Sequence, residues 1–306
     1  MGLAVFYTQT ADAADSTIET ADALVEKVTY DPKTGYFSLQ TDGIPAKNMG
    51  DDRWYKIYIE LPNGEILYSA RFVYSPLRYA KSAMTDTSVS EEMRTLCVAL
   101  MNYGAEAQKY FASVPNSSYT YETLMNTDAA FAPYKNKVRA YDTSMITPYV
   151  ANQKPVEFAY ANSNFTGLPG ASLTLTGAID LNLTFTAKKS GKITSAGMLV
   201  WSAQKYAEVE TLTLENAAEV IYAKPEAIIG SSFKVSYAGT PAKELGDTIY
   251  FVGFFEIDGT TYYSGVVSRH IEFYAGKAIE SDATLKPLME AMIVYGDHAK
   301  DYFANN

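Results

Sequence analysis

A long-period internal repeat is the feature that most restricts how this chain of 306 residues can fold. Residues 43–51 match residues 239–247 at six of nine positions, an offset of 196. Residues 103–111 match residues 295–303 through Tyr-Gly and Tyr-Phe pairs at an offset of 192. The order of the blocks is kept while the offset changes by four residues, which predicts two copies of one folding unit.

Each copy is predicted to contain antiparallel strands. The pairs Asn63-Gly64 and Asp258-Gly259 favour tight hairpin turns between alternating apolar strands. Further strands precede the hairpins and open the second copy. We expect them at residues 37–39, 173–175, 181–186, 198–201 and 233–237.

Each copy is also predicted to close with helices. Short helices are expected at residues 76–84 and 270–279. Over residues 93–111 and 285–303, apolar side chains recur at three- and four-residue steps, which indicates an amphipathic helix, and Ser90 is a suitable N-cap. Both long helices carry an internal glycine, which predicts close approach of each helix to its sheet. These glycines are Gly104 and Gly296.

The predicted fold class is therefore α+β and β-rich, with two tandem copies of an antiparallel sandwich-like sheet and a C-terminal amphipathic helix. We expect copy one at residues 1–115, a connector at residues 116–165 with a weak helix around residues 127–141 that is interrupted at Pro133, and copy two at residues 166–306. Because residues 1–7 already read as a strand, we expect a piece of a longer protein, with copy one lacking its first strand or two.

The charge and the cysteine content argue against several classes of partner. The chain has 25 Lys and Arg against 35 Asp and Glu, a net charge of −10, so a nucleic-acid partner is not expected. No apolar run approaches the roughly 18 residues of a membrane-spanning helix. The single cysteine, Cys97, excludes an intrachain disulfide and a Cys-based zinc site, and it lies on the apolar stripe of a helix. We expect a monomer without cofactor or metal.

No motif selects catalytic residues. A glycosidase requires two carboxylates about 5–10 Å apart, and no local pattern singles out such a pair. Glu60 and Glu256 recur at equivalent positions, as any duplicated surface residue would. Neither His270 nor His298 belongs to a recognisable triad pattern. The protein is predicted not to be an enzyme.

Five segments form a recognisable pattern of short motifs. They are Gly-Ala-Ser-Leu and Gly-Ala-Ile in residues 170–179, Gly-Met-Leu-Val-Trp at 197–201, and the stretches at residues 242–249, 258–265 and 292–303. This pattern resembles a repeated module of secreted and cell-surface proteins from gut anaerobic Gram-positive bacteria. The resemblance implies a non-catalytic part of a cellulosome- or amylosome-like polysaccharide-degrading assembly, joined to other domains of a longer surface protein. It implies no particular site residues.

The aromatic content suggests a sugar ligand. The chain has 25 Tyr, 14 Phe and 2 Trp, and aromatic rings stack on the apolar faces of sugars. Alternation over residues 54–61 points the apolar odd-numbered side chains toward the core. Trp54 and Tyr58 then share the outer face with two charges, where Trp54 either stacks on a ligand or contacts the other module.

The remaining candidates are placed less sharply by their context. Trp201 follows an apolar run and is either a core residue or a platform at a strand end. Tyr206, Tyr262 and Tyr263 lie near turns. Arg71 could donate hydrogen bonds to sugar hydroxyls, or it is a solvated surface charge.

Two functions follow from these observations. The first is a secreted or cell-surface carbohydrate-binding protein that recognises a polysaccharide or oligosaccharide by aromatic stacking. Its predicted ligand-binding residues are Trp54, Tyr58, Arg71, Trp201, Tyr206 and Tyr262. Starch-like α-glucan is the first choice of ligand, because of the assemblies that the resemblance implies. The alternative is a structural spacer or protein-interaction module of a cell-surface protein.

Overall fold

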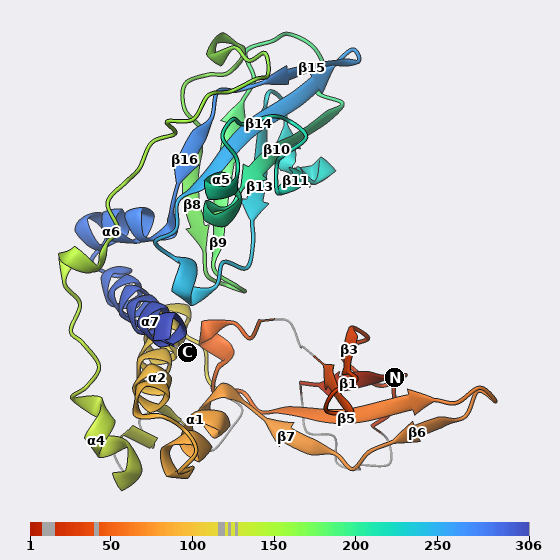
Figure 1. Ribbon diagram of the computed structural model, residues 1–306, viewed down its shortest axis with the longest axis vertical. Coiled ribbons are helices and arrows are strands. Elements are labelled where there is room, and N and C mark those ends of the chain that lie inside the picture. The colour runs from red at the N-terminus through yellow and green to blue at the C-terminus, as the bar shows by residue number, and fades with distance from the viewer. Residues whose placement is uncertain (8–15, 40–42, 116–119, 122–123, 126–127, 306) are drawn as a thin grey trace. The chain divides into compact units, whose positions relative to one another are not determined.

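The computed structural model divides the chain into two compact units, Met1–Val138 and Arg139–Asn306 (Figure 1). Each unit combines antiparallel sheet with helices, so the fold class is α+β. The boundary falls inside residues 116–165, the stretch predicted as a connector. The structure describes residues 1–7, 16–39, 43–115, 120–121, 124–125 and 128–305.

The C-terminal unit contains two sheets that pack face to face. Their strands are β8 (Gly170–Thr174), β9 (Asp180–Thr186), β10 (Ser195–Trp201), β11 (Glu219–Tyr222), β12 (Ile228–Ile229), β13 (Ser232–Tyr237), β14 (Ile249–Ile257), β15 (Thr260–Tyr263) and β16 (Val267–Arg269). One sheet has the order β11-β10-β14-β15, with β16 also paired to β14, and the other has the order β12-β13-β9-β8. Between them, Phe165 meets Phe255 edge-on with 5.1 Å between ring centroids.

Helices and short turns complete the C-terminal unit. They are α5 (Ala203–Glu208), α6 (Ile271–Ser281) and α7 (Lys286–Asn305), with 3₁₀ turns η3 (Thr143–Met145), η4 (Asn162–Asn164), η5 (Pro225–Ala227) and η6 (Ala242–Glu244). The two helices predicted at its C-terminal end are confirmed. The ring of His270 begins α6, because its Nδ1 accepts a hydrogen bond from the backbone N–H of Phe273 over 3.2 Å.

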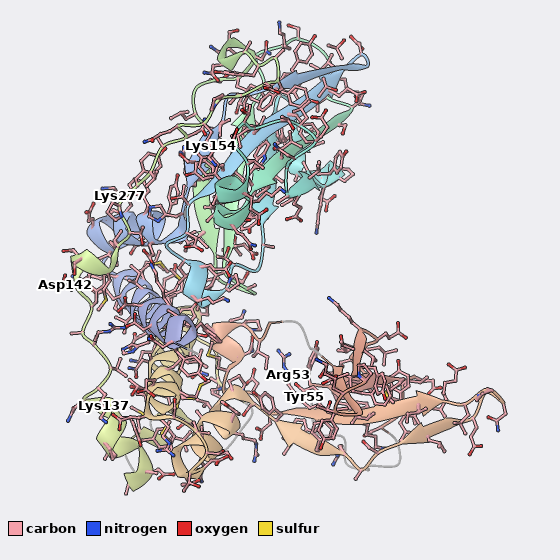
Figure 2. The ribbon with its side chains drawn as sticks, in the orientation of Figure 1. Arg53, Tyr55, Lys137, Asp142, Lys154 and Lys277 are labelled. Atoms are coloured by element: carbon pink, nitrogen blue, oxygen red, sulfur yellow. The ribbon has the colours of Figure 1, made fainter. Side chains whose placement is uncertain are left out.

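The N-terminal unit has one larger sheet and a separate hairpin. Its strands are β1 (Gly2–Phe6), β2 (Ala23–Val25), β3 (Val28–Asp31), β4 (Tyr36–Leu39), β5 (Arg53–Glu60), β6 (Ile66–Tyr68) and β7 (Phe72–Tyr74). The sheet has the order β2-β1-β5-β6, with β7 also paired to β5, while β3 and β4 pair only with each other within the described residues. Figure 2 labels Arg53 and Tyr55 of β5, and Tyr55 is buried against Leu39 of the hairpin.

The helices of the N-terminal unit also follow the predicted order. They are α1 (Pro76–Thr85), α2 (Glu91–Phe111) and α4 (Ala132–Lys135), with η1 (Ala46–Asn48) and η2 (Ala129–Phe131). The hydroxyl of Ser90 accepts a hydrogen bond from the backbone N–H of Met93, so the predicted N-cap of α2 is confirmed. The weak helix expected around residues 127–141 is reduced to η2 and α4, and residue 127 lies outside the described residues.

The two units repeat the same sheet with the same strand register. In the N-terminal unit Gly2 lies opposite Tyr58, and in the C-terminal unit Gly197 lies opposite Phe254, the equivalent residue of β14. Strand β1 therefore corresponds to β10, and the match between the units extends back to Gly2, earlier than the motifs alone indicate. The same comparison matches β2 to β11, β4 to β13, β5 to β14, α1 to α6 and α2 to α7.

One layer distinguishes the two units. Within the described residues, the N-terminal unit has no counterpart of β8 and β9, the strands that extend the second sheet of the C-terminal unit. Phe233 of β13 stacks on Phe185 of β9 and is 1% exposed. Its equivalent in β4, Phe37, is 52% exposed. The N-terminal unit is thus a half-covered version of the same sandwich.

The internal glycines mark close contacts, although not with the sheet that the sequence suggested. A Cβ on Gly296 would come within 2.8 Å of Leu245 Cδ1 and 3.0 Å of the Ala242 carbonyl oxygen. A Cβ on Gly104 would meet Met49 Sδ at 3.1 Å. Helices α7 and α2 therefore approach the η6 and η1 turns, which precede the central strands.

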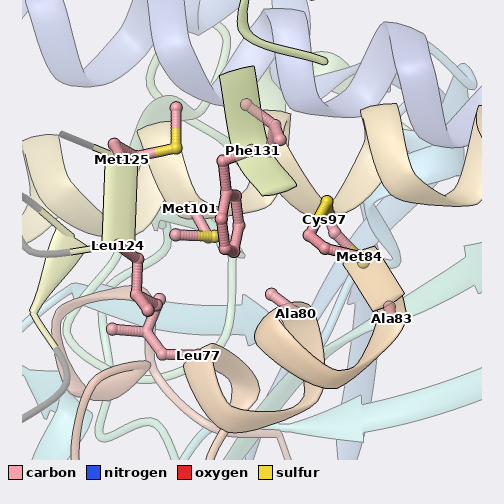
Figure 3. Packing of buried hydrophobic residues seen from close by; sticks show 10 residues of the cluster. Leu77, Ala80, Ala83, Met84, Cys97, Met101, Leu124, Met125 and Phe131 are labelled. Atoms are coloured by element: carbon pink, nitrogen blue, oxygen red, sulfur yellow. The ribbon is translucent and has the colours of Figure 1, made fainter. Parts of the chain in front are cut away.

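The helical core of the N-terminal unit is built from α1, α2 and the segment that follows them. Leu124, Met125 and Phe131 pack against Leu77 and Met101 (Figure 3). Cys97 belongs to the same cluster, as its place on the apolar stripe predicted, and burial raises the pKa of its thiol to about 11. A thiol held neutral in this way is poorly reactive.

The stretch predicted as a connector is divided between the units. Its described residues before Arg139 include members of the helical core of the N-terminal unit, among them Leu124, Phe131 and Val138. In the C-terminal unit, the backbone N–H of Thr147 donates a hydrogen bond of 2.8 Å to Glu272 Oε2, and Val156 forms a bridge with Leu212. This part of the connector is therefore built into the fold of the second unit.

Candidate functional site

The two candidates on β5 are more covered than strand alternation predicted. Tyr58 is 6% exposed and Trp54 is half-buried, and both pack with Phe6 and Ile18. The hydroxyl of Tyr58 donates a hydrogen bond of 3.3 Å to Glu26 Oε1. The expected outer face is covered because the segment around Ile18 folds over it, whereas Ile59, expected in the core, is exposed.

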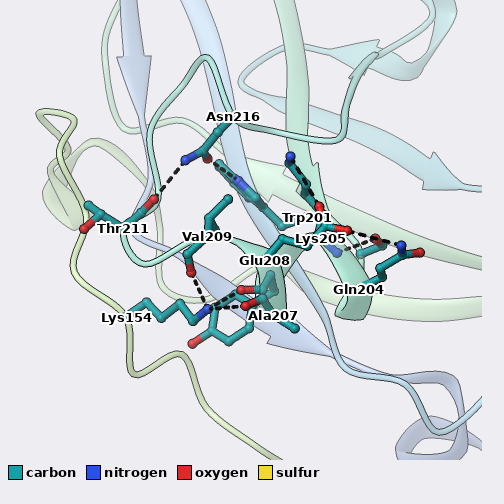
Figure 4. A network of polar contacts seen from close by, with 11 residues as sticks. Lys154, Trp201, Gln204, Lys205, Ala207, Glu208, Val209, Thr211 and Asn216 are labelled. Carbon is teal, nitrogen blue, oxygen red and sulfur yellow. Dashed lines mark hydrogen bonds and ion pairs between the residues drawn. The ribbon is translucent and has the colours of Figure 1, made fainter.

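Trp201 is a core residue. It is fully buried, and its Nε1–H donates a hydrogen bond of 2.8 Å to Asn216 Oδ1 (Figure 4). Of the two alternatives that the sequence left open for Trp201, the core position is the one observed.

Tyr206 makes contacts through both its ring and its hydroxyl. It stacks on Tyr250 with 3.6 Å between ring centroids and 9° between planes. Its hydroxyl donates a hydrogen bond to Asn152 Oδ1, and the ammonium of Lys154 lies 4.5 Å from its ring centroid. Lys154 also donates to the carbonyls of Tyr206 and Val209 at the end of α5, which holds this helix in place (Figure 4).

The other two predicted residues lie elsewhere. Tyr262 stacks on Phe255 with 5.2 Å between ring centroids, and Lys189 lies over its ring. Arg71 is half-buried just before β7 in the N-terminal unit. The six residues predicted from the sequence therefore do not form one cluster.

A different set of rings forms a continuous row in the C-terminal unit, which we call the aromatic stripe. Successive ring centroids are 6.1 Å apart from Tyr160 to Phe158, 6.0 Å from Phe158 to Tyr263, 6.3 Å from Tyr263 to Phe254, and 5.6 Å from Phe254 to Tyr222. The rings at the two ends, Tyr160 and Tyr222, are exposed, the latter by 64%. Large exposed aromatic rings are the side chains that stack on sugar faces.

A hollow of about 240 Å³ lies at the Tyr222 end of the stripe, and we call it the Tyr222 hollow. Polar groups from four strands border it. Its lining residues are Ser195, Leu199, Leu214, Val220, Tyr222, Phe254, Glu256, Thr261 and Tyr263. Aromatic and apolar walls with a few polar groups are typical of small-ligand sites, and this volume is below the roughly 300–1,000 Å³ of drug-sized pockets. It suits a single ring or the end of a longer chain.

The polar groups of the hollow are held by the sheet. Glu256 is half-buried, and its side chain accepts a hydrogen bond of 3.4 Å from the hydroxyl of Thr194. Burial, together with the nearby Tyr222 and Glu215, raises the pKa of the Tyr263 hydroxyl. Tyr263 is therefore a neutral hydroxyl at physiological pH, able to donate one hydrogen bond.

The register of the second hairpin was the signal that could have located this site. Asp258 and Gly259 both adopt positive φ, as the predicted tight turn requires. This turn places Phe254 opposite Tyr263 and Phe255 opposite Tyr262. Tyr263 therefore shares the outer face with Phe254, while Tyr262 faces the other way. Tyr222 comes from β11, and no local pattern connects it to the hairpin.

The N-terminal unit has a closed version of the same surface. The position of Tyr222 corresponds there to Glu26. Leu3 pairs with Val25 as Met198 pairs with Ile221, and Glu26 and Tyr222 are the next residues of the two chain segments. Glu26 accepts the hydrogen bond of Tyr58. The hydroxyl of Tyr68, the counterpart of Tyr263, accepts a hydrogen bond from the backbone N–H of Ile18. The hydroxyls of Tyr58 and Tyr68 are thus used in contacts within this unit.

The histidines have structural partners. His270 is fully buried as the N-cap of α6, and burial lowers its pKa. Nε2 of His298 accepts a hydrogen bond from the backbone N–H of Arg139 over 3.1 Å. Across the part of the chain that the structure describes, no three His, Cys, Asp or Glu side chains gather as they would to hold a metal ion.

Comparison with known proteins returned no relative. No family model, no curated protein and no solved structure matches this chain. Of the helices within the described ranges, none combines the length and the apolar character that crossing a membrane requires.

Proposed function

We propose that this chain is a non-catalytic carbohydrate-binding protein of a bacterial surface polysaccharide-utilisation system. The observation that supports it is the exposed ring of Tyr222, which borders a hollow walled by Phe254 and Tyr263 and flanked by the carboxylate of Glu256. The rings offer apolar stacking surface, and the acid and hydroxyl groups offer hydrogen bonds to sugar hydroxyls.

The ligand class and the setting come from the resemblance of the sequence motifs. Starch-like α-glucan is the first ligand, and a plant cell-wall glucan is the second. The protein acts outside the cell, secreted or at the surface, within a longer surface protein. Because Glu26 replaces Tyr222 in the N-terminal unit, binding is assigned to the C-terminal unit alone.

Titration calorimetry with maltooligosaccharides, soluble starch and xyloglucan tests the proposal. We expect heat with the α-glucans, and Tyr222→Ala should weaken binding about tenfold or more, since losing a stacked ring costs on the order of 1.4 kcal/mol. Tyr110→Ala is the matched control, because Tyr110 is exposed but belongs to α2 of the N-terminal unit and is not one of the rings of the stripe. Titrations without heat for all three glycans would refute the proposal.

A second variant measures the length of the site. Tyr160 lies at the opposite end of the aromatic stripe from Tyr222. Tyr160→Ala should therefore weaken the binding of long oligosaccharides more than the binding of short ones. Trp54→Ala is tested in parallel, and loss of binding by a folded Trp54→Ala protein would move the site to the N-terminal unit.

The alternative, a spacer or protein-interaction module, is supported by a different observation. The N-terminal unit exposes Phe37 of the β3-β4 hairpin and Phe72 of β7, whereas their equivalents in the C-terminal unit, Phe233 and Val267, are buried. Contiguous exposed apolar side chains of this kind mark surfaces that bind other proteins.

A further inference from the structure

A second hollow of the C-terminal unit, with a volume of about 220 Å³, lies at the other end of β10 and β14 from the Tyr222 hollow. Ser202 follows the last residue of β10 and Ile249 begins β14, and both line this second hollow. The two hollows share no lining residue. The polar lining of the second one, which we call the acidic hollow, comes from Ser202, Gln204, Tyr237, Thr240, Glu244 and Asp247.

The carboxylates of the acidic hollow are only partly neutralised. Within the described residues Asp247 accepts no hydrogen bond, and burial raises the pKa of its carboxyl more than Lys300 and Lys243 lower it. Glu244 meets the exposed ammonium of Lys243 at 3.8 Å, a contact that water screens. The hydroxyl of Tyr237 lies in the same field, because its pKa is raised by burial and then by nearby carboxylates, that of Glu244 first. The hollow is therefore a region of negative potential.

A hydroxyl without a partner borders the same hollow. Thr240 is 7% exposed, and its Oγ1 is buried and makes no hydrogen bond to any described residue. An unpaired buried hydroxyl is costly, and a polar ligand in the hollow would give it a partner. The first copy of the repeat has Ile44 at this position, so the fold itself does not require a hydroxyl there.

The N-terminal unit fills the equivalent space with a cation of its own. Tyr7 is the counterpart of Ser202, one residue after the paired strands β1 and β10, and Arg53 is the counterpart of Ile249. The guanidinium of Arg53 lies 5.1 Å from the centroid of the Tyr7 ring, a cation–π contact. The C-terminal unit thus has an opening between two positions that this pair joins in the N-terminal unit.

The acidic positions differ between the copies in the same sense. In the N-terminal unit Asn48 Nδ2 donates a hydrogen bond of 2.6 Å to Asp51 Oδ2. The equivalent residues of the second copy are Glu244 and Asp247, so two carboxylates replace a carboxylate with its amide donor. The C-terminal unit therefore lacks an N–H donor here and has an extra negative charge. A ligand with cationic N–H groups supplies what is missing.

We propose that the acidic hollow binds a protonated amino sugar. Its ammonium is held by Glu244 and Asp247, and its ring hydroxyls bond with neutral polar groups of the lining, among them the hydroxyl of Thr240. The volume suits one sugar ring. The site is separate from the Tyr222 hollow and does not depend on the function proposed above.

Two other classes of ligand fit the acidic hollow less well. Among the described residues no three His, Cys, Asp or Glu side chains gather to hold a metal ion, so a hard divalent cation lacks its ligand set. An anion such as phosphate would be repelled by the two carboxylates.

Ligand-observed NMR titrations of the full chain with three related sugars test the proposal. D-glucosamine, N-acetyl-D-glucosamine and D-glucose carry an ammonium, a neutral amide and a hydroxyl at the same ring carbon. At pH 6.5 we expect glucosamine to bind about fivefold or more tightly than either neutral sugar, the effect of one ion pair. Equal affinities for the three sugars, or no binding of glucosamine, would overturn the proposal.

Variants of the acidic hollow locate the binding. Asp247→Asn should weaken glucosamine binding about fivefold and leave the neutral sugars unchanged. Glu226→Gln is the matched control, because it removes one negative charge from an exposed position of the same unit outside the hollow. Equal losses in both variants would refute the site. Tyr222→Ala should leave glucosamine binding unchanged, so this result and the titrations with α-glucans are independent.

Thr240→Val separates binding from folding, because it removes the hydroxyl and keeps the shape of the side chain. It should weaken glucosamine binding about threefold while Tm stays the same or rises, since the fold no longer buries an unpaired hydroxyl. A lower Tm with unchanged glucosamine affinity would show that the hydroxyl belongs to the fold and would count against the site.

A fourth probe distinguishes an amino sugar from a protein partner. Nα-acetyl-lysine methylamide carries an ammonium without ring hydroxyls, and it should bind about fivefold or more weakly than glucosamine. Equal or tighter binding of this probe would overturn the amino sugar and assign the hollow to a lysine side chain of another polypeptide.

Discussion

The side chain of Asn216 holds three groups at once inside the C-terminal unit. Its Oδ1 accepts hydrogen bonds from Trp201 Nε1 and from the backbone N–H of Thr213, and its Nδ2 donates to the Thr211 carbonyl. Because Trp201 is fully buried, removing its acceptor leaves a buried donor without a partner. The loop between α5 and β11 is therefore tied to the core through this one residue.

Asn216→Leu should destabilise the C-terminal unit by about 1–3 kcal/mol, the usual cost of a buried unpaired polar group. Differential scanning calorimetry would show a fall in Tm of roughly 2–4 °C for each kcal/mol. Gln204→Leu is the control, because Gln204 is exposed on α5 and should change Tm little. Equal effects of the two substitutions would contradict this account of Trp201.

His270 makes stability depend on pH in a defined direction. Burial lowers the pKa of His270 below its ordinary value of 6.5, so the folded protein takes up this proton less readily than the unfolded chain. The stabilisation of the folded state by neutral His270 is fully present above pH 6.5 and is lost as pH falls below that value. The pKa of His298 is also lowered, mainly by burial and then by the charge of Arg139. His298 therefore also makes the folded state less stable as pH falls.

Urea unfolding at pH 7.5 and pH 5.5 would measure this loss. His270→Asn keeps an N-cap acceptor for α6 but does not titrate, so it should reduce the difference in unfolding free energy between the two pH values. Adding His298→Asn should reduce the difference further. An unchanged pH dependence in both variants would show that neither imidazole is responsible.

At the scale of elements, the two long helices offer a matched comparison. Alanine in place of an internal glycine gains about 1 kcal/mol of helix propensity. At Gly296 the added Cβ meets Leu245 at 2.8 Å and a backbone oxygen at 3.0 Å. At Gly104 the nearest atom is the flexible Met49 Sδ at 3.1 Å, and the backbone oxygen of Ala46 is farther away, at 3.3 Å.

Gly296→Ala should therefore lower the unfolding free energy by about 1–2 kcal/mol, because overpacking outweighs the gain in propensity. Gly104→Ala should lie close to neutral, since the methionine can move aside. Urea denaturation of both variants gives the comparison. Equal destabilisation would mean that the turn at η1 is as rigid as the turn at η6.

Most elements could be predicted because their signals are local. Ser90 begins α2 through a bond three residues away, and Asp258-Gly259 forms a turn with both φ angles positive. The weak helix predicted around residues 127–141, with its interruption at Pro133, is reduced to η2 and α4, where Phe131 packs into the helical core.

At the scale of the whole molecule, the missing layer predicts unequal stability of the two units. The C-terminal unit buries apolar residues between two sheets, while Phe37 and Phe72 of the N-terminal unit are exposed. Buried apolar area is the main source of stability, so the N-terminal unit should unfold at the lower temperature.

Calorimetry of the full chain should then show two transitions. Leu77→Ala lies in the helical core of the N-terminal unit and should reduce its unfolding free energy by about 2–5 kcal/mol. The temperature of the first transition should fall accordingly. Asn216→Leu should lower the second. A single transition shifted equally by both variants would mean that the units unfold together.

The sequence by itself determined the duplication, the hairpins, the helices and the α+β class, because periodicity, caps and turn residues act over a few neighbouring positions. Only the tertiary structure decided which aromatic rings are accessible. Tyr58 and Phe254 are equivalent in the repeat, yet Tyr58 donates a hydrogen bond to Glu26, while Phe254 lies beside an exposed Tyr222. The exposure of a ring depends on what packs beside and above it, and those residues come from strands far away in the chain.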